Sequence, residues 1–463
     1  MLQSSIAAAG PVERLIDVNV SPSDPKVIVL GYENGGGGLI YTRDQGSSFE
    51  LLPVTAMNQT LRDRGTTAIT GDGKTLMGLF TGLWEDDGKG CNWTQVPEFQ
   101  GVWVSDLDAH PTDPMVLFAI TSMHAVSDAV PQNSLYQRDA SGAWSKLGGP
   151  QDLLLTSVRA TKLGDGIRIY ESGFRTPPLT PDGGATDSIH VVRYSDDMGM
   201  NWTEHMFSDP MGGKSIRIEA VDPTNPNRLV LSAARTGSVA IMVSSDRGES
   251  FQNFLMLSDL GGIVFEPSGA IWIGEPQGIS NPSASRGLWH APNLMDTPTK
   301  LGTYGVQCLH YQAPAGPLYA CQAYSFGTVD PASGEFSERT KFASMPKFVT
   351  CDADVASASK VQLCKDYCTN GHFAQAPICC AYNDPTCGPA IAVEEDTGGP
   401  ANCPAGTPGS TPIGAAAGSG AAGGAASAGS GALAGNAAPS AGSSAASGSS
   451  GAGAGRGGCS ASG

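Results

Sequence analysis

The chain has 463 residues, of which 61 are Gly and 32 are Pro, and a formal net charge of −17 from 44 acidic and 27 basic residues. An acidic balance of this size argues against a nucleic-acid partner, because binding a phosphate backbone needs clusters of Lys and Arg. The abundance of Gly and Pro indicates a chain with many tight turns.

Residues 1–11 are expected to form a separate N-terminal segment. They lack the basic region and the long apolar stretch of a secretory signal, although Ala7, Ala8 and Ala9 resemble the remnant of a cleavage site. The sequence contains no run of about 18 apolar residues, so it predicts no membrane-spanning helix.

One short motif recurs three times. Its pattern, S/T-x-D-x-G-x-(S/N)-aromatic, occupies Thr42–Phe49, Ser195–Trp202 and Ser244–Phe251. Gly permits the positive φ that a tight turn often needs, and the Asp carboxylate accepts hydrogen bonds from turn N–H groups that no strand satisfies. The aromatic residue is expected to pack under the following strand. Each motif therefore predicts a turn between two strands.

A second repeat precedes two of these motifs and also occurs once more. It consists of a strand, a pair of prolines three residues apart, and a run rich in β-formers, at Val20–Leu30, Ala109–Phe118 and Val221–Leu231. Two prolines this close cannot lie inside a central strand, so they predict a turn between the first and second strands of a unit.

The two repeats divide residues 12–345 into seven units of four strands. We therefore predict an all-β fold, a seven-bladed β-propeller of four-stranded antiparallel blades, although six or eight blades remain possible. Helical periodicity over twelve or more residues is hard to find before about residue 355. The predicted blades cover residues 12–54, 66–97, 102–148, 153–207, 215–257, 261–301 and 306–342.

The first motif resembles the Asp-box of the sialidase-type, or BNR, repeat. That resemblance implies that each copy lies on the hairpin between the third and fourth strands of a blade. It also implies a structural role for Asp44, Gly46, Phe49, Asp197, Gly199, Trp202, Asp246, Gly248 and Phe251. Sialidases carry an Arg-Ile-Pro motif on their first inner strand, which Val12–Asp17 lacks, so sialidase activity itself is not expected.

Eleven cysteines are unevenly distributed, and seven of them crowd residues 346–403. Crowding of this kind in a poorly hydrophobic segment predicts a small disulfide-rich module, with zinc binding as the alternative. Cys308 and Cys321 lie in consecutive predicted strands and are expected to pair. Cys351–Cys364 is the preferred pair inside the module, and Cys91 or Cys459 would complete its odd number.

Residues 404–463 consist almost entirely of Ala, Gly and Ser and are expected to form a disordered linker. The ending around Gly458-Cys459 resembles the start of a myxobacterial C-terminal surface-sorting tail. That resemblance implies anchoring through Cys459, with the membrane reached only through an anchor that would follow this sequence. A chance free cysteine is the alternative. The expected location is extracellular or on the bacterial cell surface, at the outer membrane.

Carboxylates on the innermost strands are the candidate catalytic groups. The alignment of blades places Asp17, Asp106, Asp108 and Glu219 on strands that line the central channel. Asp106 and Asp108 share one strand face by the period of two. Such a ring is compatible with a hydrated channel, with a cation site, or with a glycosidase, whose carboxyl groups lie about 5 to 9.5 Å apart.

Two functions are therefore expected. The first is a non-enzymatic binding module, presumed monomeric and without cofactor, that takes a glycan, peptide or protein ligand at one end of the propeller. Three long insertions suit this role, Ser122–Asn133, Phe174–Ser188 and Gln277–Arg286, because recognition usually resides on loops of a rigid scaffold. The alternative is an extracellular glycoside hydrolase that uses the channel carboxylates. Propellers that cleave xyloglucan have similar repeats, usually in two tandem units.

Overall fold

The computed structural model describes residues 14–33, 38–51, 66–122, 133–175, 189–207, 215–276, 286–323, 325–341, 347–348 and 459–461. The chain divides into two compact units, of which the first comprises Met1–Ser410 and Gly457–Gly463, and the second Thr411–Arg456. Every described residue belongs to the first unit.

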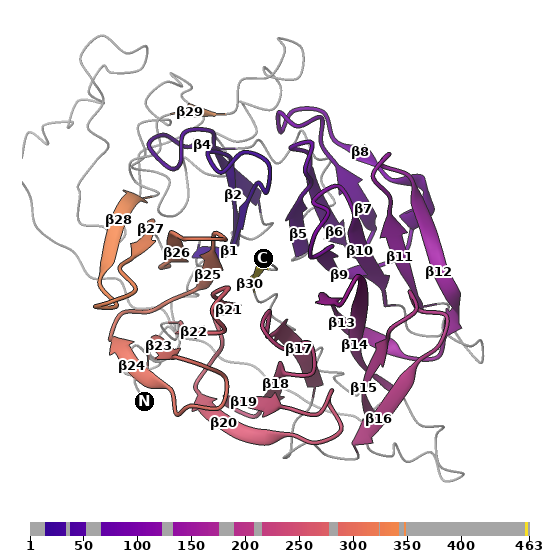
Figure 1. The fold of residues 1–463 in the computed structure, drawn as a ribbon. Coiled ribbons are helices and arrows are strands. Elements are labelled where there is room, and N and C mark those ends of the chain that lie inside the picture. Colours follow the sequence, from indigo (N-terminus) through magenta and orange to yellow (C-terminus); the bar gives the residue numbers. More distant parts are fainter. Residues whose placement is uncertain are drawn as a thin grey trace, which may run out of the picture. The chain divides into compact units, whose positions relative to one another are not determined.

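Seven antiparallel sheets confirm the predicted seven-bladed propeller. In each sheet the four strands follow the chain from the innermost to the outermost position. Figure 1 shows the sheets in a ring, with the first strand of each blade nearest the centre. In the described part of the chain the only helix is a single 3-10 turn, Pro97–Phe99. None of the described helices has the length and hydropathy that crossing a bilayer requires.

The strands of the first four blades have the following bounds. Blade one contains β1 (Arg14–Val20), β2 (Ile28–Glu33), β3 (Gly38–Thr42) and β4 (Glu50–Leu51). Blade two contains β5 (Thr66–Ile69), β6 (Thr75–Leu79), β7 (Gly82–Glu85) and β8 (Thr94–Gln95). Blade three contains β9 (Val104–Ala109), β10 (Leu117–Thr121), β11 (Asn133–Arg138) and β12 (Trp144–Gln151). Blade four contains β13 (Leu154–Leu163), β14 (Gly166–Arg175), β15 (Ile189–Ser195) and β16 (Thr203–Phe207).

Three further blades complete the ring. Blade five contains β17 (Ser215–Val221), β18 (Leu229–Arg235), β19 (Ser238–Ser244) and β20 (Gln252–Leu257). Blade six contains β21 (Gly262–Phe265), β22 (Ile271–Glu275), β23 (Gly287–Ala291) and β24 (Thr299–Gly302). Blade seven contains β25 (Cys308–Tyr311), β26 (Leu318–Cys321), β27 (Ser325–Val329) and β28 (Phe336–Lys341). Two short strands pair in parallel at sheet edges, β29 (Lys347–Phe348) with β4 and β30 (Cys459–Ala461) with β21.

The order of the strands places each loop between strands at one of the two ends of the propeller. Neighbouring innermost strands run in the same direction, since Asp106 binds Val158 N and Asp108 binds Ala160 N, two residues further along both strands. The first-to-second and third-to-fourth hairpins therefore share one end, which we call the turn end. The second-to-third connections and the links between blades share the other, which we call the loop end.

Apolar side chains from adjacent blades fill the space between the sheets. The cluster between blades three and four, for example, combines Phe118 and Leu135 with Val158, Ile169 and Val191, all at most 1% exposed. Such packing follows from alternation in strands whose two faces both meet a neighbouring blade. Among the described residues the hydrophobic core thus consists of six clusters, each between two adjacent blades, rather than one central mass.

Where the ring closes, the four main strands of blade one and of blade seven each come from one continuous segment, and the short β29, which follows blade seven, joins the outer edge of blade one. Leu15 N donates to Ala323 O at 3.0 Å, and the rings of Phe49 and Phe326 meet edge to face with centroids 5.6 Å apart. Phe49 is the aromatic residue of the first repeat turn, so this turn contributes to closure.

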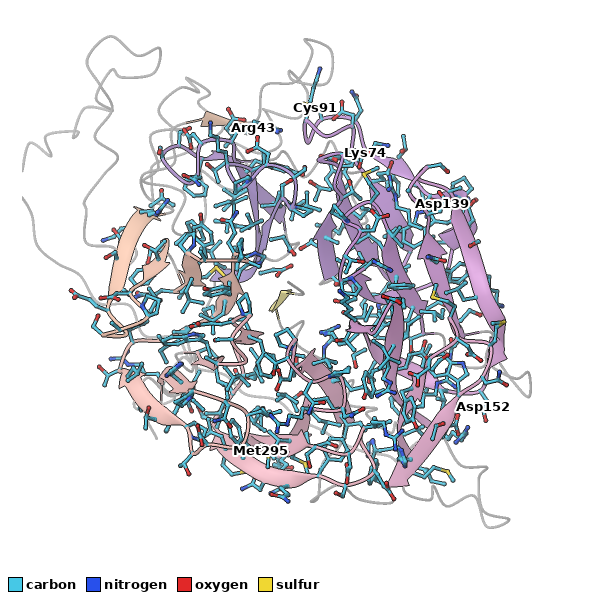
Figure 2. All side chains as sticks on the ribbon, viewed as in Figure 1. Arg43, Lys74, Cys91, Asp139, Asp152 and Met295 are labelled. Carbon is cyan, nitrogen blue, oxygen red and sulfur yellow. A yellow bond between two sulfur atoms is a disulfide. The ribbon has the colours of Figure 1, made fainter. Side chains whose placement is uncertain are left out.

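The disulfide predicted in blade seven is confirmed. Cys308 and Cys321 form the predicted disulfide across paired strands, with Cα atoms 5.0 Å apart. Cys91, which lies near the rim of blade two in Figure 2, is also disulfide-bonded. The module at 346–403, the pair Cys351–Cys364 and most of the tail at 404–463 lie outside the described residues, and the domain boundaries stay a prediction.

Candidate functional site

The three repeat turns have one hydrogen-bond pattern. In each, the first hydroxyl donates to the Asp Oδ1 at 2.7 to 2.8 Å and accepts the Gly N–H at 2.8 Å. The same Oδ1 accepts the N–H of the residue four positions after the Asp, at 2.8 to 3.0 Å. The Gly φ angles are 86°, 80° and 87°, a region that favours glycine. All three turns join a third strand to a fourth.

These bonds keep the repeat carboxylates ionised. The pKa of Asp197 lies below its usual value because the backbone and side chain of Asn201 bind it. Burial raises the pKa of Asp44 and of Asp246, but hydrogen bonds from Ser48 and Ser250 outweigh that effect and lower it. Each Asp is thus occupied in holding its own turn. The assignment of the turns to the sialidase-type repeat family stays a prediction.

Three of the four candidate channel carboxylates come together with two arginines on β9, β13 and β17. We call Asp106, Asp108, Arg159, Arg217 and Glu219 the charged cluster. Asp106, 1% exposed, accepts Arg159 Nη1 and Val158 N on one oxygen and Arg217 Nη2 on the other, at 2.6, 3.0 and 2.6 Å. Both oxygens of this carboxylate are therefore already bound.

The other two carboxylates of the charged cluster are held in the same wall. Asp108 accepts Ala160 N at 2.6 Å, and Glu219 accepts the Ser232 hydroxyl at 2.5 Å. Glu219 also lies 3.9 Å from Arg217 Nε. Burial lowers the pKa of Arg159, but Asp106, Asp108 and Glu219 outweigh it, so its pKa is raised above the usual value. The guanidinium remains charged and links three blades.

Asp17 belongs to a different neighbourhood. It is half-buried on β1 and accepts Val18 N at 2.8 Å, Asn19 Nδ2 at 3.0 Å and the Thr67 hydroxyl of blade two. The predicted ring of four carboxylates is therefore split between blades one and two on one side and blades three to five on the other.

Sequence reasoning gave Arg159 no role and took Arg217 to be as easily a salt-bridged surface residue. Each is a charged residue between apolar neighbours on an innermost strand, in Val158-Arg159-Ala160 and in Ile216-Arg217-Ile218. The sequence did contain a pattern that predicts this pairing. Each arginine alternates with apolar residues on an innermost strand, and that strand was expected to face the channel carboxylates. Among the described residues, no group of three His, Cys, Asp or Glu is arranged to hold a metal ion.

At the loop end, an aromatic pair reaches the surface between blades two and three. Phe80, on the β6–β7 turn, is 49% exposed, and its ring lies 4.6 Å from that of Trp103. The strands that flank the three long insertions, β10 and β11, β14 and β15, and β22 and β23, have their adjoining ends at this same end. The interiors of those insertions lie outside the described residues.

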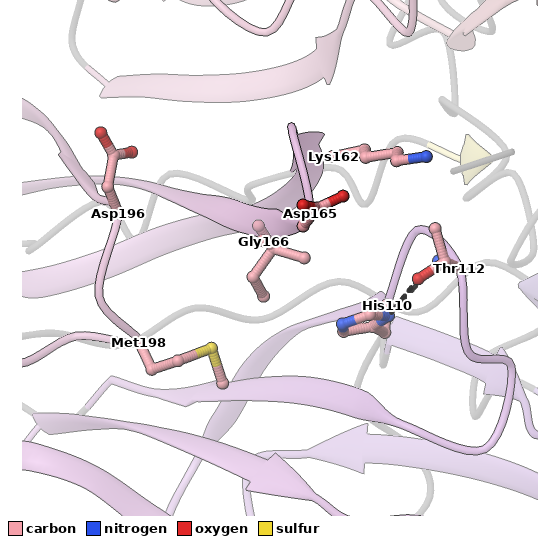
Figure 3. Close-up of a pocket in the computed structure, with 8 residues that line it drawn as sticks. His110, Thr112, Lys162, Asp165, Gly166, Asp196 and Met198 are labelled. Atoms are coloured by element: carbon pink, nitrogen blue, oxygen red, sulfur yellow. Dashed lines mark hydrogen bonds between the residues drawn. The ribbon is translucent and has the colours of Figure 1, made fainter.

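At the turn end, a cavity of about 280 Å³ lies between blades three and four (Figure 3). We call it the turn-end cavity. His110 and Thr112 of the β9–β10 turn form one side, the β13–β14 hairpin forms another, and the β15–β16 turn completes it. The full lining is His110, Thr112, Lys162, Asp165, Gly166, Ile167, Asp196 and Met198.

Comparison with known proteins bears on the fold. No family model and no curated protein matches the sequence. Among solved structures, an ancestral GH74 enzyme is 13% identical, with 71% of this chain and 46% of that chain covered and a TM-score of 0.49. YCF48 from Cyanidioschyzon merolae is 14% identical, covering 68% and 94%, with a TM-score of 0.42.

A YCF48 bound to D1 peptide is 18% identical, covering 56% of this chain and 74% of that one, with a TM-score of 0.36. The chain spans about half of the length of the GH74 structure. The similar structures thus include both a GH74 enzyme and a peptide-bound protein. At these identities the likeness concerns the propeller fold and transfers no activity or ligand to this chain.

Proposed function

We propose that this protein is an exported, non-enzymatic recognition propeller of the cell surface, which binds a glycan, peptide or protein partner at its loop end. The observation that carries the proposal is the state of Asp106. A glycosidase needs one carboxylic acid that can donate a proton and a second carboxylate free to act as nucleophile or base. Asp106 has both oxygens bound to guanidinium groups inside the wall.

The loop end supports recognition in two ways. Phe80 and Trp103 offer an aromatic surface, and a partly exposed aromatic side chain contributes much contact area at little conformational cost. The three longest insertions begin and end there, on a scaffold whose strands are rigidly paired.

Export is supported by the cysteines. Cys308–Cys321 and the bonded Cys91 are stable in an oxidising compartment, whereas disulfides are rare in reducing ones. The surface anchor at Cys459 belongs to the same proposal and rests on the resemblance of the tail, since the Cys459 side chain lies outside the described residues.

The test combines binding and turnover on the oxidised full-length chain. Glycan and peptide arrays would be probed with the wild type and with Phe80→Ala, while chromogenic glycosides are assayed with the wild type and with Glu219→Gln. Binding that Phe80→Ala weakens, with no glycoside turnover, is the expected result. Turnover that Glu219→Gln abolishes would overturn the proposal and establish the hydrolase instead.

A further inference from the structure

The turn-end cavity exists because blades three and four end at different heights. Asp108 lies level with Ala160, so β9 ends at Ala109 opposite Thr161, whereas β13 continues to Leu163. The β13–β14 hairpin closes through Gly164, whose φ is +59°, and Asp165. It therefore stands above the neighbouring Pro turn and forms a wall beside it.

His110 departs from the repeat at this place. Blades one and five carry Ser21 and Asp222 at the equivalent position, and each accepts N–H groups of its own Pro turn. In blade three, His110 Nδ1 does this, accepting Thr112 N at 3.3 Å and Asp113 N at 3.1 Å. With Nδ1 as the acceptor, the neutral ring carries its proton on Nε2. Figure 3 shows the other ring nitrogen directed away from Thr112, toward the cavity.

The remaining wall supplies both donors and acceptors. Lys162 and Asp165 make no ion pair with any described residue. Asp196 is oriented by Arg168, whose Nε and Nη2 donate to its two carboxylate oxygens at 2.6 and 2.8 Å. The thioether of Met198 and the side chain of Ile167 form an apolar floor that is continuous with the core between blades three and four.

The balance of these groups selects a class of ligand. Lys162 and Arg168 compensate Asp165 and Asp196, and burial lowers the pKa of His110, which keeps it neutral. The charges around the cavity therefore cancel, and an uncharged ligand is favoured over an anion or a cation. A volume of about 280 Å³ suits one small ring rather than an extended chain.

We propose that the turn-end cavity binds a single uncharged sugar residue. Its hydroxyl groups meet the donors and acceptors of the wall, and its C–H face lies on Ile167 and Met198. This site is independent of the proposed recognition surface at the loop end, which lies at the other end of the propeller.

The experiment is saturation-transfer NMR on the oxidised full-length protein, with methyl glycosides of glucose, galactose, mannose and xylose as probes. His110→Ser places in blade three the residue that blade one uses in the same turn, so the turn is expected to keep its acceptor while the imidazole, with its Nε2 donor and its contact with Phe118, is lost. Asp165→Asn is a second variant of an exposed hairpin residue. Lys26→Met, in the Pro turn of blade one, is the matched control.

At least one glycoside is expected to bind in the millimolar range, with affinity reduced about tenfold by either cavity variant and unchanged in Lys26→Met. Phe80→Ala is expected to leave glycoside binding at the turn-end cavity intact. Failure of the cavity proposal can therefore be distinguished from failure of the loop-end proposal. Two results would overturn the inference: no saturation transfer from any glycoside, whether or not glycine as a further probe responds, or glycoside binding that survives both cavity variants.

Discussion

The innermost strands of blades three to five and those of blades six and seven line the same channel with different chemistry. On β9, β13 and β17, charged residues pair across blades, as Asp106 does with Arg159 and Arg217. On β21 and β25 there is no Asp, Glu, Lys or Arg. There the blades meet through apolar side chains and through close backbone approach at Gly261, where an added Cβ would lie 1.9 Å from Val306 O.

The contrast shows two ways to hold neighbouring blades. The apolar wall is stabilised because apolar surface is removed from water and closely packed. The charged wall must offset the cost of taking ions out of water, and it does so only while each ion keeps its partners. The two walls should therefore respond to mutation in different ways.

The largest effect is expected from Asp106→Ala in the charged wall. Removing this carboxylate leaves Arg159 and Arg217 charged without their shared partner, which should lower the free energy of unfolding by about 3–5 kcal/mol. Urea unfolding measures this, with exposed Asp165→Ala as a control expected to stay within about 0.5 kcal/mol. A loss below about 1 kcal/mol would mean that the charged cluster is not a structural device.

A smaller loss is expected in the apolar wall from Gly261→Ala. The new methyl group meets the backbone of Val306, and strands of blades six and seven must separate, at a cost of about 1–3 kcal/mol. Gly166→Ala is the control, since its Cβ would lie in ordinary contact, 3.7 Å from Leu163 O. Equal stability of both variants in urea would contradict the close packing of these blades.

A third prediction concerns the turn that ends the third strand of blade five. Ser244→Ala removes a hydroxyl that donates to Asp246 at 2.7 Å and accepts Gly248 N at 2.8 Å, for an expected loss of about 1 kcal/mol. Glu249→Gln, at an exposed position of the same turn, should change nothing measurable by thermal unfolding. If the two variants have the same midpoint of thermal unfolding, the Ser244 hydroxyl does not stabilise the turn.

The smallest effect at neutral pH is expected from His310 in blade seven. Its Nδ1 is buried without a hydrogen-bond partner among the described residues, and burial lowers its pKa from 6.5 to about 4. Because folding favours the neutral ring, its contribution to stability is complete above about pH 6.5 and declines as the pH falls toward about 4.

His310→Leu should therefore reduce the amount by which the free energy of unfolding falls between about pH 6.5 and about pH 4. At neutral pH the histidine is uncharged in both states, so its titration contributes no difference there. Urea titrations at both pH values measure the difference. His110 and His290 also have lowered pKa values and act in the same direction, so some acid sensitivity should remain in the variant. An unchanged acid dependence would show that His310 is not its source.

Much of the architecture could be predicted from residues that act locally. Pro22 and Pro25 exclude a strand between β1 and β2, and the Thr42–Phe49 pattern supplies its own turn hydrogen bonds, so both features are readable without knowing any neighbour. Cys308 and Cys321 were predictable as a pair because consecutive antiparallel strands place them side by side. Because the unit repeats along the chain, the same strand order could be predicted for blades whose turn motif is incomplete.

The candidate site could be predicted only in part. Strand alternation placed Asp106 and Asp108 on one face, but that they share a buried cluster with Glu219, while Asp17 bonds to blade two, depends on which blades are adjacent and at what register. The two arginines that occupy these carboxylates come from blades four and five. No local pattern in β9 reports them.

The sequence by itself thus determined the propeller class, the order of the strands and the chemistry of the turns, and it favoured seven blades over six or eight, because short-range sterics and hydrogen bonds repeat along the chain. Only the tertiary structure decided which charges meet and where a cavity remains. The turn-end cavity arises from two residues of extra height in β13 beside a turn that carries His110 in place of Ser or Asp. Both the pairing of buried charges and the gaps in packing are properties of contacts between blades, and those contacts are set by the closed ring rather than by any one segment.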